Sequence, residues 1–291
     1  LQFEPNGSQY DIVSPYAIAQ YLSGKIGDRC RVFQPDYWLD LNAADPARLH
    51  EEAYRYSIRY QYAFEHSTSR RLFLMHNDVL ILRDVLGFML EQMGEAVAVG
   101  YLGQCWNCPA HVEELTREVM GRGPCGSDTY MDFRPDYEQL QQLYALAHQR
   151  GIFARPYDRG FTGIFDQQPW PLPECRINEW ACLLDLEASR PVCVPNGPVL
   201  PPGAYRQCGP VCLDIGVEWF RGMHARGRFA RHVDLSRHLK HWVGTGKVTA
   251  RRYALAEENA LKILLASFPE YCDWLRSTIH NKPLGVSDRR N

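Results

Sequence analysis

The feature that most constrains this chain is a short apolar run that ends in three polar residues. Residues 72–75 read Leu-Phe-Leu-Met and residues 76–78 read His-Asn-Asp. An apolar run of this length, bounded by polar residues, predicts one buried strand. Residues 84–93 then carry apolar side chains at helical spacing. A carboxylate at the C-terminal end of a buried strand lies where open α/β sheets bind ligands, so Asp78 is expected at such an edge.

The rest of the chain continues this alternation of strand-like and helix-like segments. The further expectations are a strand at 96–102, a helix at 137–149 ended by Gly151, a buried run at 177–186, a helix at 214–225 with Asp214 as its N-cap, and a helix at 249–266. The sequence therefore predicts an α/β fold whose mostly parallel sheet is flanked by helices and followed by a C-terminal helical extension. We expect one domain over residues 1–246 and a helix with a polar tail over 247–291.

Composition excludes several classes of protein. A net charge of −2 provides no broad basic surface, so no nucleic-acid partner is expected. The sequence has no run of 18 apolar residues, so no transmembrane helix is expected, and no segment has the pattern of a signal peptide. Ten cysteines in 291 residues fall below the density of disulfide scaffolds. We expect reduced thiols and a cytoplasmic location, with peripheral attachment at the inner membrane as a variant of it.

Four motifs occur in an order that is similar to one enzyme fold. They are the strand–helix–strand module at 72–103, the acidic residue that opens the segment 214–227, the His-Trp-Val-Gly-Thr-Gly run at 241–246, and the Asn-Gly-Ser turn at 6–8. This order resembles the GT-A fold glycosyltransferases, particularly the family 2-like nucleotide-sugar transferases. The resemblance covers roughly residues 3–246, and the first strand of the family would precede Leu1.

The resemblance implies a metal-dependent glycosyltransferase of the hexosyltransferase kind. Such an enzyme moves a sugar from a nucleotide-diphosphate donor to a hydroxyl acceptor such as a glycan, in polysaccharide biosynthesis. Mn²⁺ or Mg²⁺ is the implied cofactor, with Asp78 as its main ligand and His241 as a second. Asn77 would contribute to the cofactor site. The alternative is a purely structural role, in which Asp78 only caps a turn.

The nucleotide side of the site departs from the family pattern. Pro5 stands where the family usually has an acid that contacts the uridine. Glu4 and Asn6 are the expected substitutes for that acid.

Two acidic residues near the end of the chain are candidates for the catalytic base. Asp214 and Glu218 are four residues apart, so on a helix both would face the same way. An inverting transferase needs a carboxylate that accepts the proton of the acceptor hydroxyl. The alternative for Asp214 is helix capping alone.

Aromatic and acidic residues in two Pro-rich or Gly-rich segments are candidates for sugar binding. Trp106 and Trp170 would stack on sugar rings, and Glu174 and Glu179 would bind hydroxyl groups or serve as reserve acid–base groups. A structural loop with the same composition is the alternative.

Two functions from other classes compete with the transferase. One is a degenerate GT-A-like binding or partner protein without activity. The other is an interaction protein stabilised by zinc, because Cys105 and Cys108 form a Cys-x-x-Cys pair followed by His111. The sequence holds no second Cys-x-x-Cys. We therefore expect packed thiols around a pocket loop.

Overall fold

The computed structural model describes residues 15–31, 33–37, 39, 43–76, 79–103, 112–121, 137–151, 176–208, 211–241, 255, 258–259, 262–263 and 265–280. The chain forms two compact units. The smaller contains residues 3–34 and 250–291, and the larger contains residues 35–249. The division at residue 246 stays a prediction.

The smaller unit is held together by a pair of helices. Helix α1 spans Pro15–Ile26 and helix α11 spans Pro269–His280. The ring of Tyr21 meets those of Tyr271 and Trp274 edge-on, with centroids 4.9 and 5.5 Å apart. The hydroxyl of Tyr21 donates to Glu270 Oε1 at 3.4 Å. The predicted helix at 249–266 lies partly outside the described residues.

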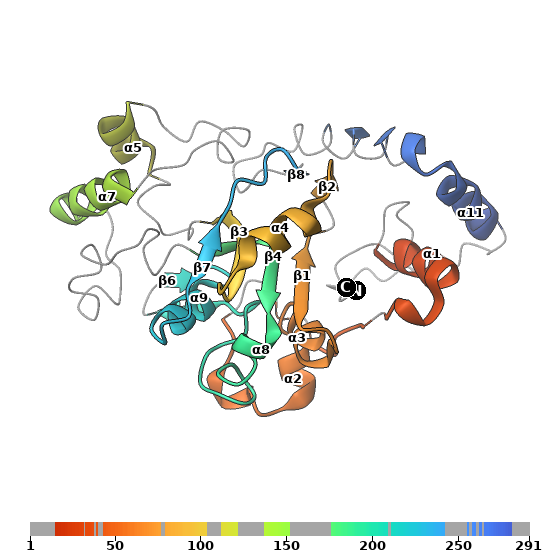
Figure 1. The fold of residues 1–291 in the computed structure, drawn as a ribbon, viewed down its shortest axis with the longest axis horizontal. Helices are drawn as coiled ribbons and strands as arrows, with labels where there is room; N and C mark the ends of the chain where they lie inside the picture. Colours follow the sequence, from red (N-terminus) through yellow and green to blue (C-terminus); the bar gives the residue numbers. More distant parts are fainter. Residues whose placement is uncertain are drawn as a thin grey trace, which may run out of the picture. The chain divides into compact units, whose positions relative to one another are not determined.

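The core of the larger unit is a sheet of four strands (Figure 1). Its order is β1 (Arg71–Met75), β4 (Ile177–Asp185), β3 (Ala98–Leu102) and β7 (Ala230–His232). The α/β class is confirmed. The expected mostly parallel pairing is wrong: β4 lies between β1 and β3 and runs antiparallel to both, and only β3 and β7 pair in parallel.

The first predicted module has its expected elements. The strand at 72–75 is β1, and the helix at 84–93 is α4 (Val85–Met93). Asp84 caps this helix, because its Oδ1 accepts from the backbone N–H of Gly87 at 2.8 Å. The strand predicted at 96–102 is β3. These three elements follow from local patterns of apolar and capping residues.

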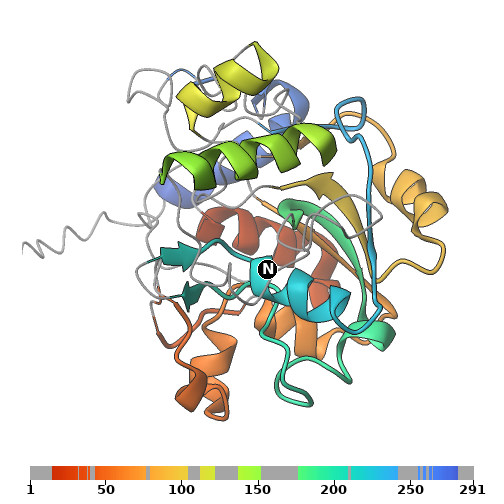
Figure 2. The same ribbon diagram turned by 90° about the vertical axis from the view of Figure 1, so that its left-hand side faces the viewer.

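Two helices cover opposite faces of the sheet (Figure 2). Met89 and Met93 of α4 pack with Val99 and Leu183. On the other face, helix α9 (Val217–His224) packs Phe220 and its neighbours against Leu74 and Leu184. Each residue of β4 is buried, since the strand is central and covered on both sides.

Further helices and two strand pairs complete the larger unit. They are η2 (Pro46–Arg48), α2 (Glu52–Tyr56), α3 (Gln61–His66), α5 (Glu113–Met120), α7 (Tyr137–Arg150), α8 (Leu186–Ser189), and the two-stranded pairs β2 (Val79–Ile81) with β8 (Leu239–His241) and β5 (Arg206–Cys208) with β6 (Val211–Leu213). The smaller unit adds η1 (Gly27–Arg29). The predicted helix at 137–149 is α7, and it ends at Gly151 with φ of 60°. Within the described ranges, no helix has the length and apolarity needed to cross a membrane.

Candidate active site

One end of each of the four strands lies along the same side of the sheet. Because β1 and β3 both run antiparallel to β4, and β7 runs parallel to β3, the carboxyl ends of β1, β3 and β7 lie beside the amino end of β4. His76 directly follows β1, and its N–H donates to the carbonyl of Trp180 at 2.9 Å. Gly103 directly follows β3, and its N–H donates to the carbonyl of Arg176 at 2.8 Å. The end of β1, where the sequence predicts a ligand site, therefore lies on the same side of the sheet as the ends of β3 and β7, and the site itself stays a prediction.

Arg176 is the centre of a buried ion cluster at this edge. Its Nη2 donates to Asp214 Oδ2 at 2.6 Å, and its Nε donates to Glu179 Oε2 at 3.3 Å. The side chains are 5%, 6% and 11% exposed, for Arg176, Asp214 and Glu179 respectively. Buried charges persist only when they are paired and hydrogen-bonded, so the three groups depend on one another.

Two glycines leave the room that the Arg176 side chain occupies. A Cβ on Gly103 would lie 3.1 Å from Arg176 Nη1. Gly216 has φ of 77° and packs against the Arg176 side chain, where a Cβ would lie 3.6 Å from Cδ. A larger residue at Gly103 would crowd the guanidinium, and one at Gly216 would be strained by the positive φ and would approach the carbonyl oxygen of Pro202 at 3.2 Å.

Two tyrosines lie close to the carboxylates of the cluster. Burial raises the pKa of Tyr60 well above its ordinary value, and the negative charge of Glu179 adds to this effect. Burial also raises the pKa of Tyr205 to about 12, against the opposing positive charge of Arg59. Both phenols therefore stay protonated at neutral pH and can donate hydrogen bonds.

Two imidazoles extend the polar edge beyond β1. His76 Nε2 lies 2.8 Å from the hydroxyl of Tyr60. The pairing of β2 with β8 sets Val79 opposite His241, whose ring lies 5.9 Å from that of His76. The same His241 ring stacks on Trp180 with centroids 5.1 Å apart. His241, which the sequence predicts as a metal ligand, thus lies beside His76, and His76 directly precedes Asn77 and Asp78.

The expectation that Asp214 caps a helix and faces the same way as Glu218 is wrong. Helix α9 begins at Val217, and its N-cap is Gly216. The left-handed backbone of Gly216 turns the chain between the two acids, so Asp214 points to Arg176 while Glu218 forms an ion pair with Arg221. The two predicted base candidates therefore belong to different environments.

Seven predicted site residues lie outside the described part of the chain: Glu4, Asn6, Asn77, Asp78, Trp106, Trp170 and Glu174. Their roles stay predictions. Within the described ranges, no three His, Cys, Asp or Glu side chains come together as a possible metal-ligand set.

The cluster contains residues that sequence reasoning gave no role. Arg176 immediately precedes a nine-residue strand that is buried throughout. An arginine in that position must have a buried acidic partner, so the sequence did hold a signal. Tyr60 and Tyr205 come from segments remote in sequence, and nothing local indicates that the charge of Glu179 acts on them.

Comparisons with protein-family models, with curated proteins and with solved structures give no match for this chain.

Proposed function

We propose that the chain is a glycosyltransferase that moves a sugar from a nucleotide-diphosphate donor to a hydroxyl acceptor with a divalent metal. One observation carries the proposal beyond the resemblance in sequence. The carboxylates of Glu179 and Asp214 converge on Arg176 at the edge of the sheet where β1 ends, two residues before Asn77. Sugar transfer needs a metal-holding acid and a proton-accepting acid within reach of the same substrate.

Asp78 and His241 are the proposed holders of Mn²⁺ or Mg²⁺. A carboxylate with an imidazole is a donor set that suits Mn²⁺, and His241 lies beside His76, two positions before Asp78. When bound, the metal would neutralise the diphosphate that leaves the sugar. The Tyr60 hydroxyl lies 2.8 Å from Nε2 of His76, and this hydrogen bond fixes the His76 ring at the C-terminal end of β1.

Glu179 is the better placed of the two buried acids to accept a proton. Asp214 has one oxygen on Arg176 and the other on the backbone N–H of Ile215 at 2.9 Å. Glu179 contacts Arg176 through Oε2 at the longer distance of 3.3 Å. We therefore assign the base to Glu179 and the positioning of Arg176 to Asp214, while Glu218 lies on helix α9, paired with Arg221.

A thermal-shift screen of nucleoside diphosphates with and without Mn²⁺ tests the proposal. A ligand that binds only the folded state stabilises it by about 2.7 kcal/mol at a hundredfold excess over its dissociation constant. The Asp78→Ala variant should lose the metal-dependent part of the shift and keep the melting temperature of the unliganded protein. If no nucleoside diphosphate shifts the melting temperature under either condition, the transferase proposal fails.

Turnover separates the two acids and the inactive alternative. With a donor found by the screen, Glu179→Gln should lower kcat by about 10²–10⁴-fold and leave donor affinity nearly unchanged. Asp214→Asn should lower stability and activity together. Nucleotide binding without any donor hydrolysis would instead favour the degenerate partner protein.

A further inference from the structure

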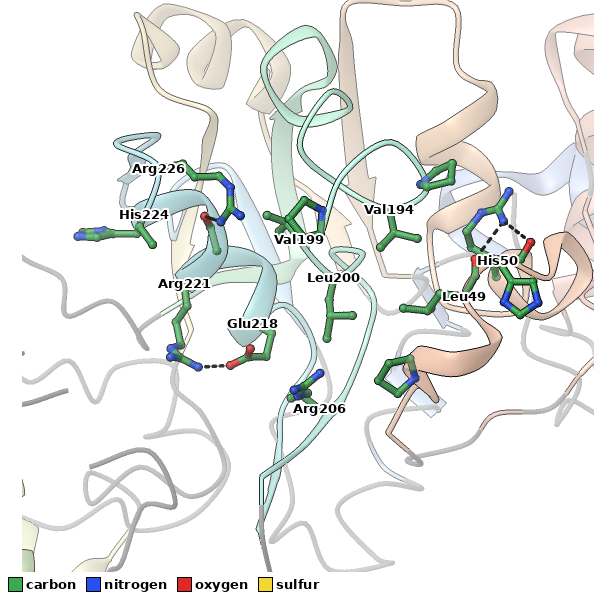
Figure 3. Close-up of a pocket in the computed structure, with 16 residues that line it drawn as sticks. Leu49, His50, Val194, Val199, Leu200, Arg206, Glu218, Arg221, His224 and Arg226 are labelled. Atoms are coloured by element: carbon green, nitrogen blue, oxygen red, sulfur yellow. Dashed lines mark hydrogen bonds and ion pairs between the residues drawn. The ribbon is translucent and has the colours of Figure 1, made fainter. Parts of the chain in front are cut away.

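A cavity lies between four segments of the larger unit (Figure 3). Its volume is about 820 Å³, within the range of pockets that bind small organic ligands. Its walls come from the segment 46–55 around η2, the loop at 194–200, Arg206 of β5, and helix α9 with the two residues that follow it. It shares no residue with the cluster of Arg176, Glu179 and Asp214. Ligand binding in this cavity is therefore independent of the proposed transferase activity.

The loop wall of this cavity is held by its own backbone. The N–H of Val194 donates to the carbonyl of Val199 at 2.9 Å, and the N–H of Val199 donates to the carbonyl of Val192 at 3.0 Å. Gly222 lets α9 pack directly on this loop, since a Cβ there would lie 2.9 Å from Val199 Cγ1. The cavity is thus formed before any ligand arrives.

One side of the cavity is apolar. Leu49, Val194, Val199 and Leu200 line it together with three prolines. Figure 3 shows the leucines and valines gathered between α9 and the segment that carries His50. Such a surface favours an apolar group, at roughly 25 cal/mol per Å² of apolar surface removed from water.

The other side of the cavity carries more positive charge than its acids neutralise. Arg55 is paired with Glu65 at 2.6 Å, and Arg221 is paired with Glu218. Arg206 and Arg226 also line the cavity. Arg226 donates to the carbonyl of Gly222 at 2.9 Å, and across the described residues no carboxylate pairs with either guanidinium.

We propose that this cavity binds an amphipathic organic anion, with an anionic head group at Arg206 and an apolar body against Leu49, Val194, Val199 and Leu200. Arg206 lies near Leu200 in Figure 3, whereas Arg226 follows the C-terminal end of α9 and already donates to the carbonyl of Gly222. A guanidinium binds phosphate or carboxylate oxygens through two parallel hydrogen bonds. Arg206 is therefore the head-group contact, and Arg226 adds a weaker, screened attraction.

Calorimetric titration with octyl phosphate, below its micelle concentration, tests this proposal on the full chain. Inorganic phosphate carries the head group alone, and octanol carries the apolar body alone. We expect saturable one-to-one binding of octyl phosphate that weakens as salt rises, and at least tenfold weaker binding of each half-ligand. Equal binding of octanol or of inorganic phosphate would overturn the proposed pairing of head group and apolar wall.

Substitutions assign the site. Arg206→Gln should weaken octyl phosphate binding about tenfold or more, because a charge-assisted contact is lost. Arg226→Gln should weaken it about two- to fivefold. Arg237→Gln is the matched control, as an exposed arginine of the same unit that does not line the cavity, and it should change nothing. Each variant should melt within a few degrees of the parent. Unchanged binding in a folded Arg206→Gln protein would overturn the proposal.

Discussion

Replacing Arg176 by methionine tests how much the buried ion cluster contributes to the stability of the folded protein. Methionine keeps much of the side-chain volume but removes the charge. Asp214 and Glu179 would then be two buried carboxylates, 6% and 11% exposed, without their shared partner. Removing one partner of a buried ion pair typically costs about 3–5 kcal/mol. Because two carboxylates lose their counter-ion here, we expect a loss near the upper end of that range.

The companion variant Asp214→Asn should be less damaging. Arg176 keeps its bond to Glu179, and the asparagine oxygen can still accept from the N–H of Ile215. A lost charge-assisted hydrogen bond costs about 1.5–3 kcal/mol. In the double variant the neutral amide no longer needs Arg176, so the combined loss should be smaller than the sum of the single losses by about 0.5–3 kcal/mol.

Urea unfolding followed by circular dichroism measures these free energies. Arg237→Met is the control, and an exposed substitution of this kind should stay within about 0.5 kcal/mol of the parent. A loss below about 1 kcal/mol for Arg176→Met, or strictly additive single losses, would show that water or other groups already compensate the carboxylates. Arg176 would then not be the group that keeps Asp214 and Glu179 stable in the interior.

Three further predictions concern other parts of the chain. Burial lowers the pKa of His232 to about 4 from its ordinary 6.5, so the unfolded state binds more protons than the folded state as pH falls. The free energy of unfolding should therefore drop between pH 6.5 and pH 4, by at most about 3 kcal/mol. In urea titrations at each pH, His232→Gln should flatten that slope. Gly203→Ala should cost about 2–3 kcal/mol of stability, because its Cβ would lie 1.9 Å from the carbonyl oxygen of Arg59. Gly121→Ala, at φ of 68° in open space, should cost only about 1 kcal/mol. Equal melting temperatures of the two variants would contradict the close approach at Gly203. Cys105→Ser combined with Cys108→Ser should release no zinc and leave melting in excess chelator unchanged, while a zinc loss of one per chain would support the zinc-stabilised alternative.

Local patterns in the sequence were sufficient for the elements around β1. The apolar run at 72–75 forms a strand because it is bounded by polar residues, and α4 follows because Asp84 can cap it. Gly151 ends α7 through its left-handed backbone. Each of these outcomes depends on residues within a few positions of one another, so no tertiary information was needed.

The pairing of the strands depends on tertiary structure. The sequence shows a strand, a helix and another strand at 72–102, which suits neighbouring parallel strands. The structure inserts β4, about 75 residues further along, between them. Antiparallel and parallel neighbours can both bury apolar strands, and a fully buried run such as β4 carries no alternation that reveals its direction.

The candidate site divides in the same way. Its acids were identified by residue type, and Glu179 and Asp214 both pair with Arg176. The sequence instead placed Asp214 with Glu218 on one helix face. A single left-handed glycine, Gly216, separates them, and Arg176 brings Asp214 to Glu179 instead. The sequence alone thus determined which groups with useful chemistry exist and that one strand, β1, ends beside polar residues. Only the tertiary structure decided which of them meet, because a buried charge needs a partner that the fold can bring from any distance along the chain.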